Sequence, residues 1–226
     1  MEQLESIIEQ AQAHLEAKNQ ARDEVLSRSR ELIRHCARAI RAVHRGEMVE
    51  AEEMLVIARQ AVQRMVGDLA EHADLYNAGY TQDALKEYVE ATITHHVIAG
   101  EPLPTPDELV VLPETYLNGL AEAMGELRRY ILDVIRHGKV ERCERLLRVM
   151  EDVYSALVTI DYPDSLTKGL RRKTDMVRGV LERTRGDLTL AARQDAMQAA
   201  LLRVEQQIRP TAAGGEAEPG ASELDA

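Results

Sequence analysis

The chain has 226 residues, enough for one helical domain with a substantial core. It contains no Phe and no Trp, so Leu, Val, Ile, Ala and Met must fill the interior, and such a core favours closely packed helices. A net charge of −11 and a pI near 5.2 argue against a protein held on nucleic acid by bulk charge alone. Any phosphate-binding surface must therefore be local.

We do not expect the first residues to form a signal peptide. These residues, MEQLESIIEQ, are acidic and amphipathic, with no basic region followed by an apolar run. No apolar run approaches the roughly 20 residues that a membrane helix needs. Cys36 and Cys143 are isolated and lack metal-ligand spacing, which is typical of small core residues in a reducing compartment. We therefore expect a soluble, cytoplasmic protein with no membrane partner.

Apolar residues recur at helical spacing through the first half of the chain. The pattern predicts helices over residues 4–44, 48–69 and about 81–98. No Pro or Gly interrupts the first of these before Gly46, so it is one very long helix or two helices joined at a weak point near Asn19. Thr81 or Asp83 can cap the third.

The second half begins with a proline-rich segment, residues 100–113, which we predict to be a loop with at most one short turn from Pro106. Further helices are predicted over residues 113–137, 140–157, 164–185 and 188–208. Asp164 or Ser165 can cap the third of these, and a turn at Gly186-Asp187 separates the last two.

No stretch alternates β-branched residues with a period of two, and no internal repeat has a fixed period. The predicted fold class is therefore all-α, one domain of about seven helices over residues 1–209. Residues 210–226 are small and acidic, and we predict them to be disordered.

Two pairs of glutamates are the strongest candidates for chemistry. Glu87 and Glu90 lie three residues apart in LKEYVEA, and Glu122 and Glu126 lie four apart in YLNGLAEAMGELRR, with Arg129 about one turn further on. Each spacing places its side chains on one helix face. If the two helices pack together, the four carboxylates converge on a site suited to Mg²⁺ or Mn²⁺, which can activate water and stabilise the leaving oxygen of a phosphodiester.

The alternative is that all four are ordinary exposed glutamates, because Glu is mostly a surface residue and the chain is rich in acid. The neighbours of Glu90 and Glu122 favour a functional interpretation, since they are mostly apolar and leave only a narrow polar strip. Carboxylates in such strips are costly unless they are paired or bind a metal.

Basic residues gather in two places. A stripe on the first helix consists of Arg30, Arg34, Arg38, Arg41 and Arg45. It can track a phosphate backbone, or it can be a solvated or intersubunit salt-bridged face. A second cluster consists of Lys168, Arg171, Arg172, Lys173, Arg178, Arg183 and Arg185. Charge runs of this kind are more often solvated faces, so this cluster, with Arg171 and Arg172, is the secondary candidate for binding nucleic acid.

The adjacent His95 and His96 raise the question of a metal site. Neighbouring residues on a helix point about 100° apart, which argues against a metal shared by the two. We expect one of them in the core and the other exposed.

Three blocks of sequence resemble the translin family, and within it translin-associated factor X more than translin itself. They are ALKEYVEA at 84–91, YLNGLAEAMGELRR at 116–129 and YPDSLTKGLRRKTDMVRGVLERTRGDL at 162–188. The segment SRELIRHCARAIRAVHRGE is also similar to the long opening helix of the family. The resemblance covers nearly everything except the tail from Pro210.

The resemblance implies an all-α subunit that assembles into a hollow, roughly octameric homo-oligomer and binds single-stranded RNA or DNA. In the factor X branch it also implies Mg²⁺-dependent endoribonuclease activity. Carried over by position, the acidic residues are Glu87, Glu90, Glu122 and Glu126, and Arg129 matches a basic position near the site. Where the family commonly has Asp, this chain has Glu122, whose extra methylene can shift the metal.

Other functions fit parts of the pattern. A translin-like oligomer that binds single-stranded nucleic acid without cutting it is the first alternative. A MazG-like nucleotide pyrophosphohydrolase also uses an E-x-x-E pair, but its second pair is typically E-x-x-D, whereas this chain has E-x-x-x-E. A ferritin-like di-iron site is disfavoured because no E-x-x-H occurs among these acids.

Overall fold

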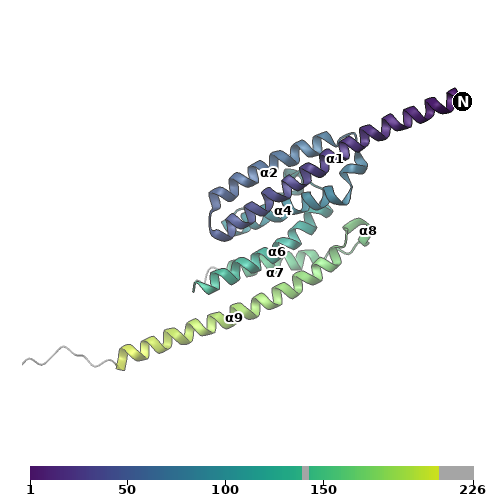
Figure 1. The fold of residues 1–226 in the computed structure, drawn as a ribbon. Helices are drawn as coiled ribbons and strands as arrows, with labels where there is room; N and C mark the ends of the chain where they lie inside the picture. The colour runs from purple at the N-terminus through teal and green to yellow at the C-terminus, as the bar shows by residue number, and fades with distance from the viewer. Residues whose placement is uncertain (139–142, 209–226) are drawn as a thin grey trace, which may run out of the picture.

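A computed structural model describes residues 1–138 and 143–208 of the chain (Figure 1). The long helices are α1 (Glu2–Arg45), α2 (Met48–Asp68), α4 (Gly79–Ala99), α6 (Pro113–Arg136), α7 (Cys143–Val158) and α9 (Leu170–Ile208). Three single turns connect them, α3 (Ala73–Tyr76), α5 (Pro106–Leu109) and α8 (Asp164–Thr167). The described part of the chain contains no strand, which confirms the all-α prediction. None of its helices combines the length and apolar character needed to cross a bilayer.

Helix α1 is continuous over 44 residues, so the predicted weak point at Asn19 does not break it. No Pro or Gly interrupts its backbone hydrogen bonds. It ends at Gly46, whose left-handed φ of 78° lets its N–H and that of Glu47 bond back to the last turn. The predicted stop at this glycine is confirmed.

The C-terminal helix corrects the prediction of two helices separated by a turn. Helix α9 runs unbroken through Gly186 and Asp187, because Leu188 and Ala191 continue its buried face and Asp187 pairs with Arg128 of α6 at 2.8 Å. The chain instead reverses earlier, between α8 and α9, where Lys168 and Gly169 both have positive φ.

The predicted caps are also wrong. Helix α4 begins after Ala78, and the Thr81 hydroxyl donates to the Leu75 carbonyl rather than capping. Helix α8 begins after Pro163 with no side-chain cap, so neither Asp164 nor Ser165 caps it. The short turn predicted from Pro106 does form as α5, where Thr105 and Glu108 make a reciprocal capping box. The predicted start at residue 140 and the tail 210–226 lie outside the described residues.

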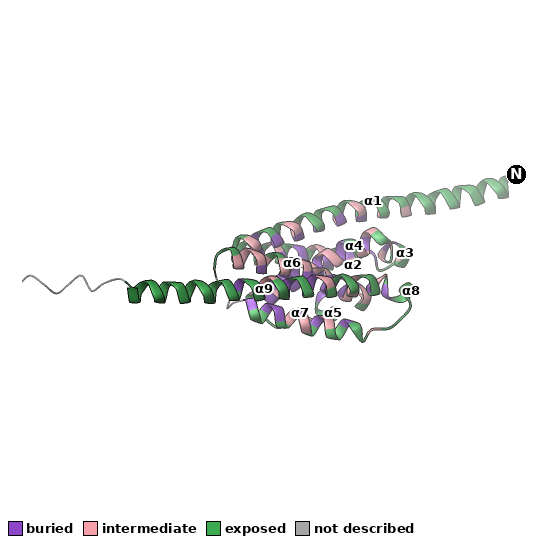
Figure 2. Ribbon diagram, turned by 90° about the horizontal axis from the view of Figure 1, so that it is seen from below, coloured by how far each residue is buried: buried purple, intermediate pink, exposed green. Residues whose placement is uncertain are grey.

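Helix α4 lies at the centre of the molecule, packed between α1 and α6, and α9 covers the other side of α6. The approach of α4 and α6 depends on Gly119, because a Cβ there would lie 2.7 Å from the Val89 side chain. Cys36 and Cys143 are fully buried, as expected of core residues. The buried residues fill the space between these helices, whereas the first turns of α1 and the last turns of α9 project from the body and are exposed (Figure 2).

Candidate functional site

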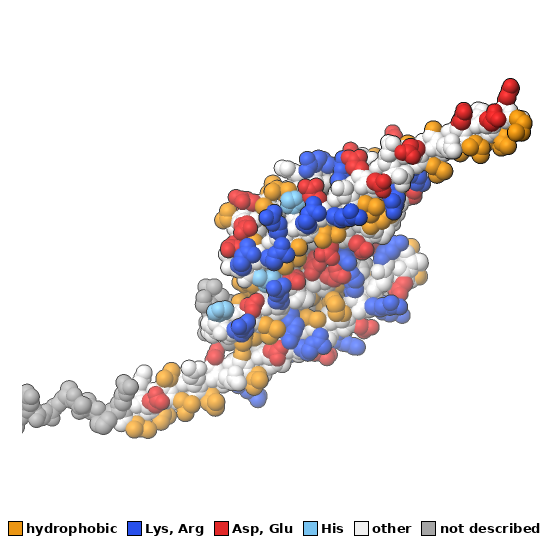
Figure 3. All heavy atoms as spheres, viewed as in Figure 1, with side chains coloured by type: hydrophobic (Ala, Val, Ile, Leu, Met, Phe, Trp, Pro, Cys, Tyr) orange, Lys and Arg blue, Asp and Glu red, His pale blue; other side chains and the backbone are white. Residues whose placement is uncertain are grey.

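The packing of α4 on α6 brings three of the four predicted acids together. Glu87 and Glu90 of α4 and Glu122 of α6 each offer a carboxylate oxygen within 4.8 Å of the others, and all three side chains are partly buried. Figure 3 shows an acidic patch at the middle of one face, between the upper helices and α9. We call Glu87, Glu90 and Glu122 the acidic cluster.

Burial and mutual repulsion dominate the electrostatics of Glu87 and Glu90 in the acidic cluster. Burial, and then the charges of Glu87, Glu122 and Glu126, raise the pKa of Glu90 to about 8. Burial also raises the pKa of Glu87, against the opposing effect of Lys86. A divalent cation would offset the repulsion between these carboxylates. Because Mg²⁺ and Mn²⁺ prefer oxygen ligands, the three residues present fit such a cation.

Glu122 is held by two lysines that the sequence analysis did not place in the site. Lys86 of α4 lies 3.2 Å from one carboxylate oxygen, and Lys173 of α9 lies 2.5 Å from the other. The structure therefore ties α9 to the acidic cluster through Lys173, a member of the second basic cluster. The sequence could have suggested Lys86, since it directly precedes Glu87. Its contact with Glu122 of α6, however, depends on how the two helices pack.

Glu126 makes a different set of contacts. Its carboxylate lies 2.5 Å from Nε2 of His44 at the end of α1, and Arg129 is 3.8 Å away. The hydrogen bond from His44 lowers the pKa of Glu126, and the charges of His44 and Arg129 act in the same direction. The structure thus separates Glu126 from the acidic cluster and adds His44, which no sequence motif singled out.

The arginine stripe lies on the solvent-facing side of α1. All five of its side chains are exposed. Arg45 pairs with Glu47, which directly precedes α2, and with Glu50 of α2. Within residues 1–138 and 143–208, the other four form no ion pair. Figure 3 shows Lys and Arg side chains over α1 next to the acidic patch. The predicted stripe is thus exposed, on a helix whose Lys and Arg side chains lie next to an acidic patch.

Three arginines of the second basic cluster pair with acids outside the acidic cluster. Arg171 pairs with Asp161 at 2.8 Å, and Arg185 pairs with Glu151 at 2.7 Å. Arg178 lies 3.6 Å from Asp175. Arg172 is exposed at the start of α9. Apart from Lys173, these contacts resemble those of a solvated helix face.

The chain is similar in sequence and in fold to several known proteins. A protein of Methanocaldococcus jannaschii that is described as uncharacterized is 33% identical over 177 residues, which cover 77% of this chain and 78% of that protein. The crystal structure of AfC3PO has a TM-score of 0.76 and 36% identity, covering 82% of this chain and 96% of that one. A structure of AfC3PO with duplex RNA has the same identity and coverage and a TM-score of 0.68.

A third structure, apo-NeC3PO, has a TM-score of 0.75 with 20% identity over 81% of this chain and 96% of that one, and it supports the fold alone. The sequence model of the Translin family matches residues 56–208, which include α4, α6 and α9 and therefore all three members of the acidic cluster. The match also extends over the residues that hold Glu122 in place, Lys86 and Lys173. The chain belongs to the Translin family.

Proposed function

We propose that this protein is a Mg²⁺-dependent endoribonuclease that cuts single-stranded or short structured RNA. The observation that carries the proposal is the acidic cluster, three carboxylates from two helices gathered within 4.8 Å beside an exposed arginine stripe. The AfC3PO structure with duplex RNA supports RNA as the ligand class.

In this proposal Glu87, Glu90 and Glu122 hold the cation, and Mn²⁺ can replace Mg²⁺. A bound ion of this kind supplies an activated water and neutralises charge on a phosphate oxygen. Lys86 and Lys173 pair with Glu122 and hold its carboxylate in place. Glu126, held by His44, lies 3.8 Å from Arg129, whose guanidinium would stabilise charge on the phosphate.

The RNA backbone would lie along Arg30, Arg34, Arg38 and Arg41, whose guanidinium groups have no acidic partner within the described chain. We further propose that several copies form a homo-oligomeric shell of about eight subunits around the RNA, as the resemblance to the family implies. Exposed apolar side chains on the projecting ends of α1 and α9 support such an assembly.

The test is cleavage of labelled single-stranded and duplex RNA by the purified protein, with Mg²⁺ or with EDTA. Glu87→Gln and Glu122→Gln should each lower the cleavage rate by about 100-fold or more while RNA binding persists, because they remove ligands without removing the arginine stripe. Glu182→Gln, an exposed glutamate of α9, is the matched control and should cleave as the wild type does.

Each outcome distinguishes a function. RNA binding without products in Mg²⁺ would identify a non-catalytic RNA-binding or DNA-binding oligomer. Release of pyrophosphate from free nucleoside triphosphates would identify a pyrophosphohydrolase of the MazG kind. Cleavage that survives in both Glu87→Gln and Glu122→Gln would disprove the assignment of the acidic cluster.

A further inference from the structure

A second group of potential metal ligands lies at the far end of α4, and we call it the His-Glu cluster. It consists of His95 and His96 in the last turns of α4 and Glu101 just beyond the helix. Gly100 adopts a left-handed φ of 82°, and the N–H groups of Gly100 and Glu101 both bond to the His96 carbonyl. This reversal turns Glu101 back toward the two histidines.

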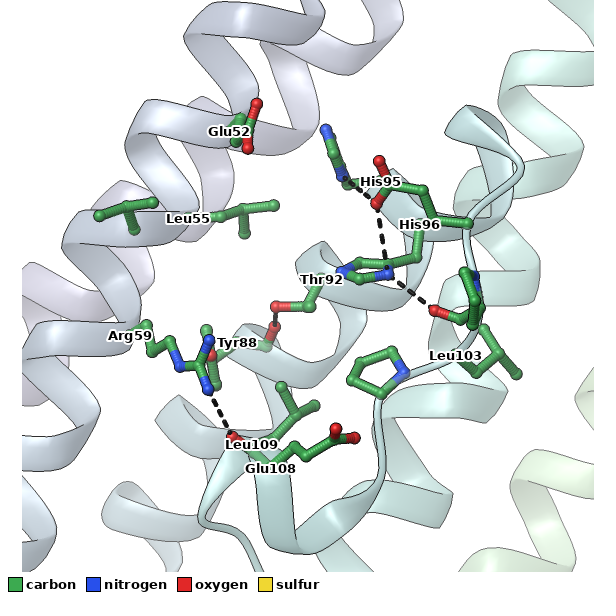
Figure 4. Close-up of a pocket in the computed structure, with 14 residues that line it drawn as sticks. Glu52, Leu55, Arg59, Tyr88, Thr92, His95, His96, Leu103, Glu108 and Leu109 are labelled. Atoms are coloured by element: carbon green, nitrogen blue, oxygen red, sulfur yellow. Dashed lines mark hydrogen bonds and ion pairs between the residues drawn. The ribbon is translucent and has the colours of Figure 1, made fainter.

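The reversal explains why two adjacent histidines can share a partner. Adjacent side chains on a helix point in different directions, and the two imidazole rings lie edge to face with centroids 5.9 Å apart. Yet Oε2 of Glu101 lies 3.5 Å from Nδ1 of His96 and 4.0 Å from Nδ1 of His95 (Figure 4). One carboxylate therefore faces both imidazoles.

His95 has a buried polar atom that no described residue satisfies. The residue is only 6% exposed, and its Nδ1 atom is buried with no hydrogen-bond partner among the described residues. The carboxylate of Glu101, at 4.0 Å, is too distant for a hydrogen bond. Leaving a buried nitrogen unpaired is unfavourable, so a partner for this atom is expected.

We propose that His95, His96 and Glu101 bind a transition-metal ion, with Zn²⁺ as the best match. Two imidazoles and one carboxylate form a common zinc ligand set, with bonds of about 2.0–2.2 Å that place tetrahedral ligand atoms roughly 3.4 Å apart. The separation of 3.5 Å fits this spacing, and the separation of 4.0 Å requires a contraction of about half an ångström. Nδ1 of His96 must exchange its contact with the Pro102 carbonyl, at 2.8 Å, for the ion.

The surroundings favour a cation with open coordination positions. The His-Glu cluster follows the C-terminal carbonyls of α4, where the helix dipole attracts positive charge. All three ligands line a pocket of about 460 Å³ that also includes Glu52 and Arg59 of α2 (Figure 4). Water or an anion in this pocket can complete the coordination.

This site is distinct from the acidic cluster. Glu90 and His95 are five residues apart on α4, which rotates them by about 140° around the helix. The ligand types also differ, because carboxylates alone suit Mg²⁺ whereas imidazoles suit zinc and its neighbours. The two sites can therefore be tested separately.

The experiment titrates Zn²⁺ into metal-free protein by calorimetry, with excess Mg²⁺ present to occupy the acidic cluster. We expect one Zn²⁺ per chain, and Co²⁺ bound in its place should give visible absorption bands. Glu101→Gln and His96→Asn should each weaken Zn²⁺ binding about tenfold or more. His137→Asn, an exposed histidine at the end of α6, and Glu87→Gln should leave it unchanged.

Circular dichroism of each variant separates loss of a ligand from loss of the fold, and Glu101 is half exposed, so its substitution should not disturb packing. The proposal is overturned if the wild type binds no Zn²⁺ under these conditions. It is equally overturned if Glu101→Gln and His96→Asn bind as the wild type does, or if only Glu87→Gln loses binding.

Discussion

Glu90 lies among three other carboxylates and is the acid in the site that is most costly to ionise. Its pKa is raised to about 8, so the folded protein keeps this proton at pH values where the unfolded chain has lost it. An acid with a raised pKa in the folded state destabilises the fold as the pH rises from its unfolded value toward its folded value. For Glu90 that window extends from about pH 4.5 to about pH 8.

Glu90→Gln should therefore stabilise the metal-free protein at pH 8 and have little effect at pH 5. The gain at pH 8 is expected to be on the order of 1–3 kcal/mol, because the glutamine carries no charge to desolvate. Urea unfolding in EDTA at the two pH values measures it, with the exposed Glu53→Gln as control. A gain of equal size at both pH values would contradict the electrostatic explanation.

Glu122 and Glu126 share a helix face but not the same partners, and a metal titration can separate them. Glu122→Gln should weaken Mn²⁺ binding by about tenfold or more, because it removes a ligand of the acidic cluster. Glu126→Gln should change the affinity by less than about threefold, since Glu126 is bound to His44 instead. Calorimetry with Mn²⁺ gives both values. An equal loss of Mn²⁺ affinity in the two variants would indicate that Glu126 is also a metal ligand.

At the scale of elements, periodicity predicted the long helices well, because each buries one continuous apolar face. The two acidic pairs were also predictable, since the spacing within each pair, Glu87 with Glu90 and Glu122 with Glu126, is local to one helix, whereas the approach of Glu122 to the first pair depends on the packing of α4 on α6. The partners of these acids were not, because Lys173 lies 51 residues from Glu122 and His44 lies 82 residues from Glu126. Such contacts depend on how α1, α6 and α9 pack, which no local pattern reports.

The continuity of α9 can be tested at the glycine where the sequence suggested a turn. In a helix, Gly186→Ala should stabilise the protein by about 0.5–1 kcal/mol, because alanine loses less backbone entropy and a Cβ there meets no atom within 4 Å. Gly46→Ala should destabilise it by about 1 kcal/mol, since Gly46 has a φ of 78°. Thermal or urea unfolding compares the two. A loss of stability in Gly186→Ala would indicate that α9 is interrupted there.

At the scale of the whole molecule, binding must overcome an unfavourable overall charge. The chain carries a net charge of −11, so a distant RNA is repelled and only a local surface can hold it. In the proposed function the arginine stripe is that surface, because it is exposed and four of its five guanidinium groups form no ion pair within the described residues. A metal ion in the acidic cluster would further reduce the local negative charge.

The double variant Arg34→Gln/Arg38→Gln should therefore bind RNA more weakly and with less dependence on salt. Each phosphate contact contributes about −0.7 to the slope of log K against log salt for single strands, so the loss of two contacts should flatten the slope by about 1.4. Fluorescence anisotropy over a range of KCl concentrations measures both quantities, in EDTA so that no RNA is cut. The control is Arg148→Gln/Arg193→Gln, which removes the same charge from exposed positions on α7 and α9. If the two double variants lose affinity equally, RNA responds to total charge, and the stripe has no special role.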